Sequence, residues 1–183
     1  IDMVATMPAI AIGMAATALT GQNLGARKPE RVKEIFKWAL LMGTAISGFI
    51  ALLAILFPRL ILSMFIHHEP VLEIGITYLR IVAPCYFLYA LMFVSTGIVN
   101  GAGQTMVTMV FSLVSLWAVR VPLAWYLSQH TRLGMTGIWI AMAAGFVVTS
   151  AISYLYYLSG RWKKYATQTH APLDERLKIA QEA

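Results

Sequence analysis

The chain has few charged residues and a single cysteine. Charged residues make up 12% of its 183 residues, whereas a soluble domain carries about 25%. Hydrophobic residues make up 59%, and the mean hydropathy is +0.71. This composition excludes an ordinary water-soluble domain and predicts a membrane protein. The lone Cys85 lies in an apolar run, so it excludes a disulfide framework and is expected to be a packing residue.

Motifs for chemistry or nucleic-acid reading are also lacking. The sequence shows no paired carboxylates, Ser/His/Asp set, His/Cys cluster or nucleotide loop. His67 and His68 are adjacent, so they point in different directions, and no further ligand follows at zinc spacing. The net charge of +6 comes without a base-reading module. We therefore expect no enzyme activity, no metal, no cofactor and no nucleic-acid partner.

Five long apolar segments are present instead. They predict helices at about 1–20, 38–57, 71–99, 106–127 and 138–158. The segment 38–57 contains no charge, and twenty helical residues cross about 30 Å of hydrocarbon. The expected fold is an all-α polytopic membrane helix bundle over residues 1–158, followed by a cytoplasmic tail over 159–183. Its surroundings would be the lipid bilayer.

Basic residues predict how the bundle is oriented. Five Lys or Arg lie in 27–37 and five in 161–178, against one each in 58–70 and 128–136. Basic loops stay in the cytoplasm. The first loop and the C-terminus are therefore expected there.

Small residues recur every fourth position in three segments, so each set shares one helix face and permits close helix packing. These seams are Ala5, Ala9, Gly13, Thr17, Gly21 and Gly25; Gly43, Ser47 and Ala51; and Gly137, Ala141, Gly145, Thr149 and Ser153.

Two prolines and two arginines are predicted to have structural or gating roles: Pro8, Arg80, Arg120 and Pro122. Pro8 should kink its helix, either for packing or as a hinge at a transport cavity. Arg120 would lie about 12 Å below the outer helix end. An unpaired charge there costs about 2.5–3.5 kcal/mol. The expected partners are carbonyls freed by Pro122, Asp2, Glu73 or groups outside these helices.

Substrate contacts are predicted on the aromatic stretch of the third segment. Tyr86, Tyr89 and Phe93 stand three and four apart and share one face, with Met14 expected nearby. Aromatic faces attract lipophilic cations, and methionine adapts to varied shapes. The alternative is that these side chains only face lipid or pack in the core, without contacting a substrate. Asp2 is expected near the outer helix end, where water keeps it ionised, so a coupling carboxylate is expected upstream of Ile1.

Several motifs together resemble the MATE (multidrug and toxic compound extrusion) family of transporters. They are Pro8–Gly13 with 15–17, Gly21–Ala26, Tyr78–Arg80 with Pro84, Asn100–Thr105, Arg120–Leu123 and Gly137–Ala141. The resemblance implies twelve helices in two six-helix lobes, of which these five would be the eighth to twelfth. The sequence starts inside a hydrophobic helix without Met, so a fragment lacking the N-terminal lobe and the seventh helix is expected.

The resemblance also implies a function. It predicts an antiporter in the plasma membrane, expected to be a bacterial inner membrane, that exports amphipathic, cationic drugs or toxins in exchange for protons or sodium. Some family members carry an acidic residue in the helix that matches 81–99, where this sequence has none. Two alternatives remain open. A lipid-linked precursor flippase would show cationic side chains along its cavity, and a non-transporting scaffold would fail a transport assay.

Overall fold

The computed structural model describes residues 2–65 and 67–163. Its long helices are α1 (Asp2–Gly25), α2 (Arg31–Leu56), α4 (Glu69–Val82), α5 (Tyr86–Gly101), α6 (Thr105–Val114), α7 (Val121–His130) and α8 (Met135–Ser159). A short α3 (Pro58–Ser63) follows α2, a 3-10 turn η1 (Ala83–Cys85) joins α4 to α5, and a π-helix η2 (Ser115–Arg120) joins α6 to α7. No strand occurs within the described ranges. The predicted all-α polytopic bundle is confirmed.

Five helical segments are long and apolar enough to cross a membrane: α1, α2, Glu69–Gly101, Thr105–His130 and α8. The second of them begins at Arg31, seven residues before the predicted start at 38. Helical hydrogen bonding continues into the charged sequence, whereas hydropathy reports only the part that matches hydrocarbon. The apolar limits therefore lie inside the helix limits.

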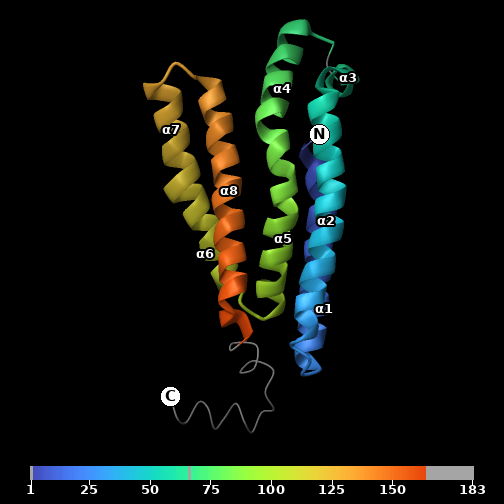
Figure 1. Cartoon of the computed structure of the whole chain (residues 1–183). Coiled ribbons are helices and arrows are strands. Elements are labelled where there is room, and N and C mark those ends of the chain that lie inside the picture. Colours follow the sequence, from blue (N-terminus) through green and yellow to red (C-terminus); the bar gives the residue numbers. More distant parts are fainter. Residues whose placement is uncertain (1, 66, 164–183) are drawn as a thin grey trace.

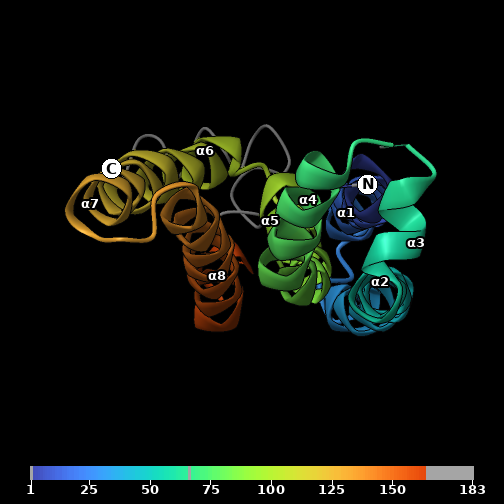
Figure 2. The ribbon, with the colours of Figure 1, turned by 90° about the horizontal axis from the view of Figure 1, so that it is seen from above.

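Helix α5 is the centre of the bundle (Figures 1 and 2). It contacts α1 and α2 on one side and α8 on the other, and α8 in turn contacts α7 and η2. Helices α1 and α5 run in the same direction (Figure 1). This arrangement places α1 and η2 on opposite sides of the α5–α8 pair.

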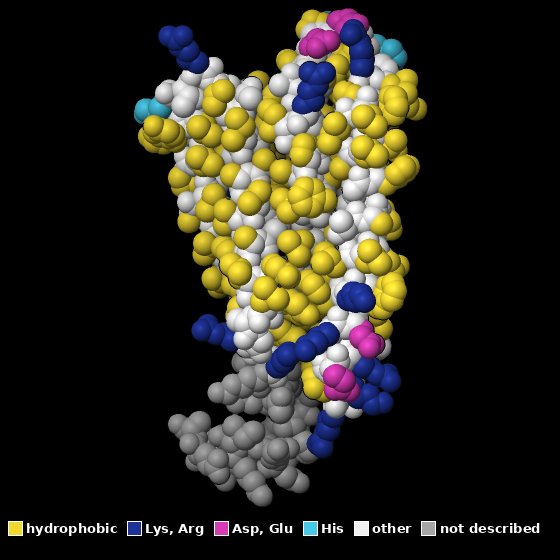
Figure 3. All heavy atoms as spheres, in the orientation of Figure 1, with side chains coloured by type: hydrophobic (Ala, Val, Ile, Leu, Met, Phe, Trp, Pro, Cys, Tyr) yellow, Lys and Arg dark blue, Asp and Glu magenta, His cyan; other side chains and the backbone are white. Residues whose placement is uncertain are grey.

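The outer surface matches a lipid environment. Figure 3 shows hydrophobic side chains along the length of the bundle and charged side chains mainly at its two ends. Large apolar side chains such as Phe49 and Trp117 are more than half exposed. Such a surface is stable against acyl chains, because lipid tails remove the cost of exposing apolar groups to water.

The predicted seam on α1 packs against α5. A Cβ atom at Gly13 would lie 2.7 Å from the Phe93 carbonyl oxygen, so the two backbones approach too closely for alanine. Thr17 and Gly21 also lie against α5, at Gly101, but the most buried positions shift to Ala16, Thr20 and Leu24, and Gly25 has no neighbour within 4 Å. Four residues turn a helix by 400°, so a strict four-residue spacing rotates away from the contact.

The seams on α2 and α8 are confirmed. Gly43, Ser47 and Ala51 are all buried. The five predicted residues of α8 are buried as well. On α8, Gly137 lies against Leu127 of α7 and Gly145 lies against Arg120 of η2. The small residues of α8 therefore allow the fourth spanning segment, Thr105–His130, to pack closely against this helix.

Aromatic residues connect α8 with α2 at the end of the bundle where the loop between α1 and α2 lies (Figure 1). The rings of Phe36 and Tyr157 stack with centroids 4.0 Å apart, and Trp162 stacks on Tyr157 at 6.0 Å. Trp162 is 1% exposed. Trp162 is therefore part of the core at this end of the bundle. Most of the predicted tail, residues 164–183, lies outside the described residues.

Candidate functional site

The carboxylate of Asp2 accepts hydrogen bonds from two tyrosines. Tyr78 Oη donates to Oδ2, and Tyr86 Oη donates to Oδ1. Tyr86 lies near the middle of the continuous segment Glu69–Gly101. Asp2 lies in the first turn of α1, as expected, and is half-buried; that water keeps it ionised stays a prediction. Its position follows from the register of α1 on α5, which the close contact at Gly13 sets.

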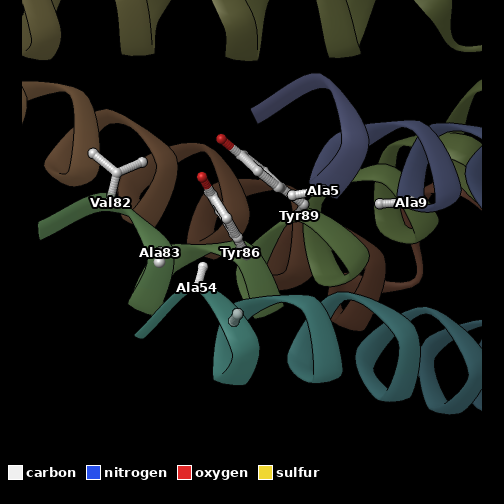
Figure 4. Packing of buried hydrophobic residues seen from close by; sticks show 8 residues of the cluster. Ala5, Ala9, Ala54, Val82, Ala83, Tyr86 and Tyr89 are labelled. Atoms are coloured by element: carbon white, nitrogen blue, oxygen red, sulfur yellow. The ribbon is translucent and has the colours of Figure 1, made fainter. Parts of the chain in front are cut away.

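Aromatic rings form a row that starts beside Asp2. Tyr86 and Tyr89 stack with centroids 5.6 Å apart, and Tyr89 meets Phe146 edge-on at 4.9 Å. Figure 4 shows the first two rings side by side with their hydroxyls pointing the same way. Phe93 lies 6.5 Å from Tyr89. The prediction that Tyr86, Tyr89 and Phe93 share one helix face is confirmed.

The four predicted substrate-binding residues differ in accessibility. Tyr86 and Tyr89 are 0% and 3% exposed and pack in a core cluster with Ala5 of α1. Met14 is 69% exposed on α1. Phe93 is half-buried and lines a pocket. Substrate contact by these residues stays a prediction, and Phe93 is the one among them that meets an open pocket in this conformation.

Arg120 lies beyond the far end of the same row. Its guanidinium carbon is 5.8 Å from the centroid of the Phe146 ring. Within the described ranges no hydrogen bond or ion pair to this guanidinium is found. Asp2 bonds to tyrosines, and Glu73 lies 3.8 Å from Arg59. Of the partners expected for Arg120, Asp2 and Glu73 are thus bonded to other residues, and a partner outside these helices stays a prediction.

The backbone around Arg120 explains where its side chain lies. Pro122 has no N–H, and the helix just before it takes the wider π form over Ser115–Arg120. On α8, Gly145 leaves room for the aliphatic part of the Arg120 side chain. A Cβ atom added at Gly145 would lie 3.5 Å from the Cβ of Arg120. The sequence analysis did not predict the π-helix. The available signal was a proline two residues after a charged residue within an apolar span.

Two adjoining pockets run along α5, α6, η2 and α8, and we call them together the hydroxyl groove. One has a volume of about 340 Å³ and the other of about 130 Å³. They share Met92, Ser112 and Thr149, and the smaller one ends at Arg120 and Phe146. The polar side chains of the groove include Thr96, Asn100, Thr108, Ser112, Ser115 and Thr149.

Hydroxyls next to Arg120 are held in a small network. Ser115 Oγ donates to the Gly145 carbonyl oxygen at 2.9 Å. Thr149 Oγ1 lies 2.6 Å from Ser115 Oγ and 2.9 Å from the same carbonyl. Because each hydroxyl has a single hydrogen, Thr149 donates either to Ser115 Oγ or to the carbonyl oxygen, and both hydroxyls are satisfied within this buried network.

The remaining predicted residues lie away from the groove. Arg80 is exposed in the last turn of α4. Helix α1 continues through Pro8, which is half-buried. At the loop after α3, Glu69 accepts a hydrogen bond from Arg59 at 2.9 Å. No group of three or more metal-ligating His, Cys, Asp or Glu side chains occurs in the part of the chain that the structure describes.

Comparison with known proteins gives consistent matches. The sequence model of a family described as MatE matches residues 1–126. A probable multidrug resistance protein NorM of Thermotoga maritima is 27% identical over 96% of this chain and 38% of its own length. The probable multidrug resistance proteins YoeA and YpnP of Bacillus subtilis are 30% and 31% identical over 86% and 89% of this chain. The chain spans 34% and 36% of those two relatives.

Proposed function

The chain belongs to the MatE family, and from this membership we propose that it forms part of a secondary active multidrug efflux transporter. The five apolar helices make it a multi-pass membrane protein. Its proposed substrates are amphipathic cationic compounds, and its proposed coupling ion is a proton or sodium. The relatives bear the name of multidrug resistance proteins, which supports the proposal.

The observation that carries this proposal is the carboxylate of Asp2 beside an aromatic row. Its oxygens are bonded to the hydroxyls of Tyr78 and Tyr86, and Tyr86 begins the row of rings. A half-buried carboxylate within an apolar bundle attracts cations, because less water competes for it than at an exposed site. Aromatic faces add attraction for a lipophilic cation of about 0.5–2 kcal/mol per contact. The two features together favour cations that are also apolar.

The same carboxylate suits ion exchange. A lipophilic cation, a proton or a sodium ion can each neutralise it, and only one of them does so at a time. Competition of this kind is the simplest physical basis of antiport, because release of one partner then requires capture of the other. In this scheme Asp2 itself would serve as the coupling carboxylate, in place of one upstream of Ile1.

The test uses the full-length transporter in proteoliposomes with rhodamine 123, a lipophilic cation. We expect an imposed proton or sodium gradient to drive its transport. Asp2→Asn should reduce the coupled rate at least about tenfold, because a charge-assisted contact contributes about 1.5–3 kcal/mol. Glu73→Gln is the matched control, since that carboxylate is exposed and faces Arg59.

Two results would contradict the proposal. A wild-type protein that does not transport rhodamine 123 under either gradient would contradict the proposed efflux function. An Asp2→Asn variant that keeps the wild-type coupled rate would show that Asp2 is not the coupling carboxylate. The coupling carboxylate would then be expected upstream of Ile1. Protein amount in the vesicles is measured for every variant.

The flippase alternative receives less support. Its lipid diphosphate cargo carries several negative charges, so its pathway should contain several cations. The hydroxyl groove contains one cationic side chain, Arg120. Among the residues that the structure describes, one guanidinium matches fewer charges than that cargo carries, so the cationic substrates proposed above fit this part of the pathway better.

A further inference from the structure

We propose that the groove between α1 and α2 binds a phosphatidylethanolamine molecule of the bilayer, in the leaflet nearest the loop that joins these two helices. Arg31 contacts the phosphate of the lipid and Glu34 contacts its ammonium, while an acyl chain lies along the apolar part of the groove. The site is separate from the hydroxyl groove, because different residues line the two. It concerns the lipid around the protein and does not rest on the efflux function.

The first argument is the size and lining of the α1–α2 groove. Its volume is about 510 Å³, and ligand sites usually have volumes of about 300–1,000 Å³. Most of its lining is apolar and comes from both helices, with Ala15 and Leu19 on α1 and Ile35 and Met42 on α2. Arg31 and Glu34 of α2 line the same groove. The groove therefore combines an apolar channel with charged groups, as an amphipathic ligand requires.

The second argument is the depth that the groove covers. Its lining on α2 runs from Arg31 to Met42, which is about 16 Å of helix. The uncharged run 38–57 matches the hydrocarbon thickness, so Trp38 lies near the boundary with the headgroups. Met42 lies about 6 Å inside that boundary, and charged side chains gather at the loop end beyond it (Figure 3). The groove thus extends from the headgroup region into the acyl chains of one leaflet.

The third argument is the pair of opposite charges at the loop end of the groove. Arg31 and Glu34 stand three residues apart, so they lie on one face of α2. Within the described part of the chain they form no ion pair with each other. A guanidinium suits a phosphate, and a carboxylate accepts hydrogen bonds from an ammonium. One phosphatidylethanolamine headgroup carries both partners a few atoms apart, so it can contact both side chains at once.

The same two charges distinguish this lipid from other phospholipids. Phosphatidylglycerol has a phosphate but no cation, so the carboxylate of Glu34 repels its net negative charge. Phosphatidylcholine has a quaternary ammonium, which has no N–H to donate to that carboxylate. Ethanolamine supplies three N–H donors together with the positive charge. The groove therefore favours phosphatidylethanolamine, and the other two lipids serve as comparisons.

The experiment measures which lipid lies beside the groove in the full-length protein. A nitrobenzoxadiazole fluorophore is attached at Leu41→Cys in a cysteine-free background, because Leu41 is exposed on α2 and does not line the groove. Phosphatidylcholine nanodiscs contain a small fixed fraction of one lipid with a nitroxide on its acyl chain, which quenches nearby fluorophores. We expect quenching by nitroxide phosphatidylethanolamine to indicate about threefold local enrichment over the other two lipids, as exposed charge pairs allow.

Three variants separate the parts of the site. Glu34→Gln should abolish the preference for phosphatidylethanolamine over phosphatidylglycerol, because the ammonium loses its carboxylate. Arg31→Gln should lower the quenching by both of these lipids toward the phosphatidylcholine level. Ala15→Trp fills the groove with a large side chain and should remove the enrichment although both charges remain. Glu30→Gln and Lys33→Gln are the matched controls, because these residues are exposed and do not line the groove, and they should leave the preference unchanged.

Three outcomes would overturn the lipid site. Equal quenching by the three lipids in the wild type is the result expected if another part of the full-length protein covers the groove. Stronger quenching by phosphatidylglycerol would contradict the ethanolamine headgroup. A preference that persists in both Glu34→Gln and Ala15→Trp would show that the lipid binds elsewhere. Because the readout is lipid proximity, each of these outcomes leaves the rhodamine 123 test of the efflux function unaffected.

Discussion

At the scale of single residues, Tyr86 and Phe93 show how one helix face divides between packing and ligand contact. Tyr86 is fully buried, and its hydroxyl donates to Asp2. Phe93 is half-buried and borders the hydroxyl groove. The same pattern of aromatic residues thus contains a core residue and a candidate binding residue about two helical turns apart.

We therefore expect different results from alanine at the two positions. Tyr86→Ala leaves a large cavity, so it should lower the free energy of unfolding by about 3–5 kcal/mol and reduce the protein level. Phe93→Ala should keep most of the protein level and change the relative efflux of several dyes. Membrane protein yield, thermal unfolding in detergent and dye efflux measure the three effects. Equal losses of yield for both variants would assign Phe93 to packing as well.

Residue-scale predictions from the sequence were correct where a pattern acts within one helix. The shared face of Tyr86, Tyr89 and Phe93 follows from helical spacing. The contacts of Arg120 and the tyrosine partners of Asp2 depend instead on how one helix is placed along another. Helix α1 settles against α5 at Gly13, and this contact brings Asp2 to Tyr78 and Tyr86. No residue pattern within a single helix predicts where α1 lies along α5.

At the scale of helices, the small-residue seam of α8 has two kinds of glycine. A Cβ atom at Gly137 would lie 2.8 Å from the Cβ of Leu127 and 2.9 Å from its carbonyl carbon. A Cβ atom at Gly145 would lie 3.5 Å from the Cβ of Arg120, an ordinary contact. The two positions look alike in the sequence, but only Gly137 lacks room for a Cβ atom.

Alanine at these two glycines should separate them. Gly137→Ala forces α7 away from α8 and should destabilise the protein by about 1–3 kcal/mol. Gly145→Ala should be tolerated, because its methyl group fits beside the arginine stem. Thermal unfolding of the full-length protein checks this difference. A larger loss for Gly145→Ala than for Gly137→Ala would contradict the packing described for this interface.

Irregular turns within helices were harder to predict from the sequence than the helices themselves. The 3-10 turn Ala83–Cys85 contains Pro84, and the π-helix Ser115–Arg120 is followed by Pro122. Proline indicates that a helix is disturbed, but the form of the disturbance depends on neighbouring helices. Apolar length alone predicted continuous helices at both places.

At the scale of the whole molecule, the distribution of basic residues predicts orientation. Lys28 lies in the exposed loop between α1 and α2, and Arg132 lies in the exposed loop between α7 and α8. The first loop is rich in Lys and Arg, and the second contains one. Because basic loops remain in the cytoplasm, we place Lys28 inside and Arg132 outside.

Cysteine labelling in whole cells tests this placement. In a Cys85→Ala background, Arg132→Cys should react with a membrane-impermeant maleimide added outside. Lys28→Cys should react only after the membrane is opened. The native Cys85 is buried, so the unmodified protein serves as the control for background labelling. The reverse pattern would invert the proposed topology.

The global architecture was the part best predicted from the sequence. Span number and apolar character follow from the match between helix length and hydrocarbon thickness, a constraint that acts on every membrane helix in the same way. The site combines α1, α5, α8 and η2, which are distant in sequence. Its geometry depends on their packing, so the sequence supplied candidate residues without their pairing.

The two hydrogen bonds of Asp2 span the turn at Pro84. Tyr78 precedes that turn on α4 and Tyr86 follows it on α5, while one rigid carboxylate accepts from both. The angle between α4 and α5 is therefore thermodynamically linked to the state of Asp2. Any cation that competes with the tyrosines for the carboxylate must relax this angular restraint. By reciprocity, any force that changes the angle must alter the cation affinity of Asp2 by the corresponding free energy.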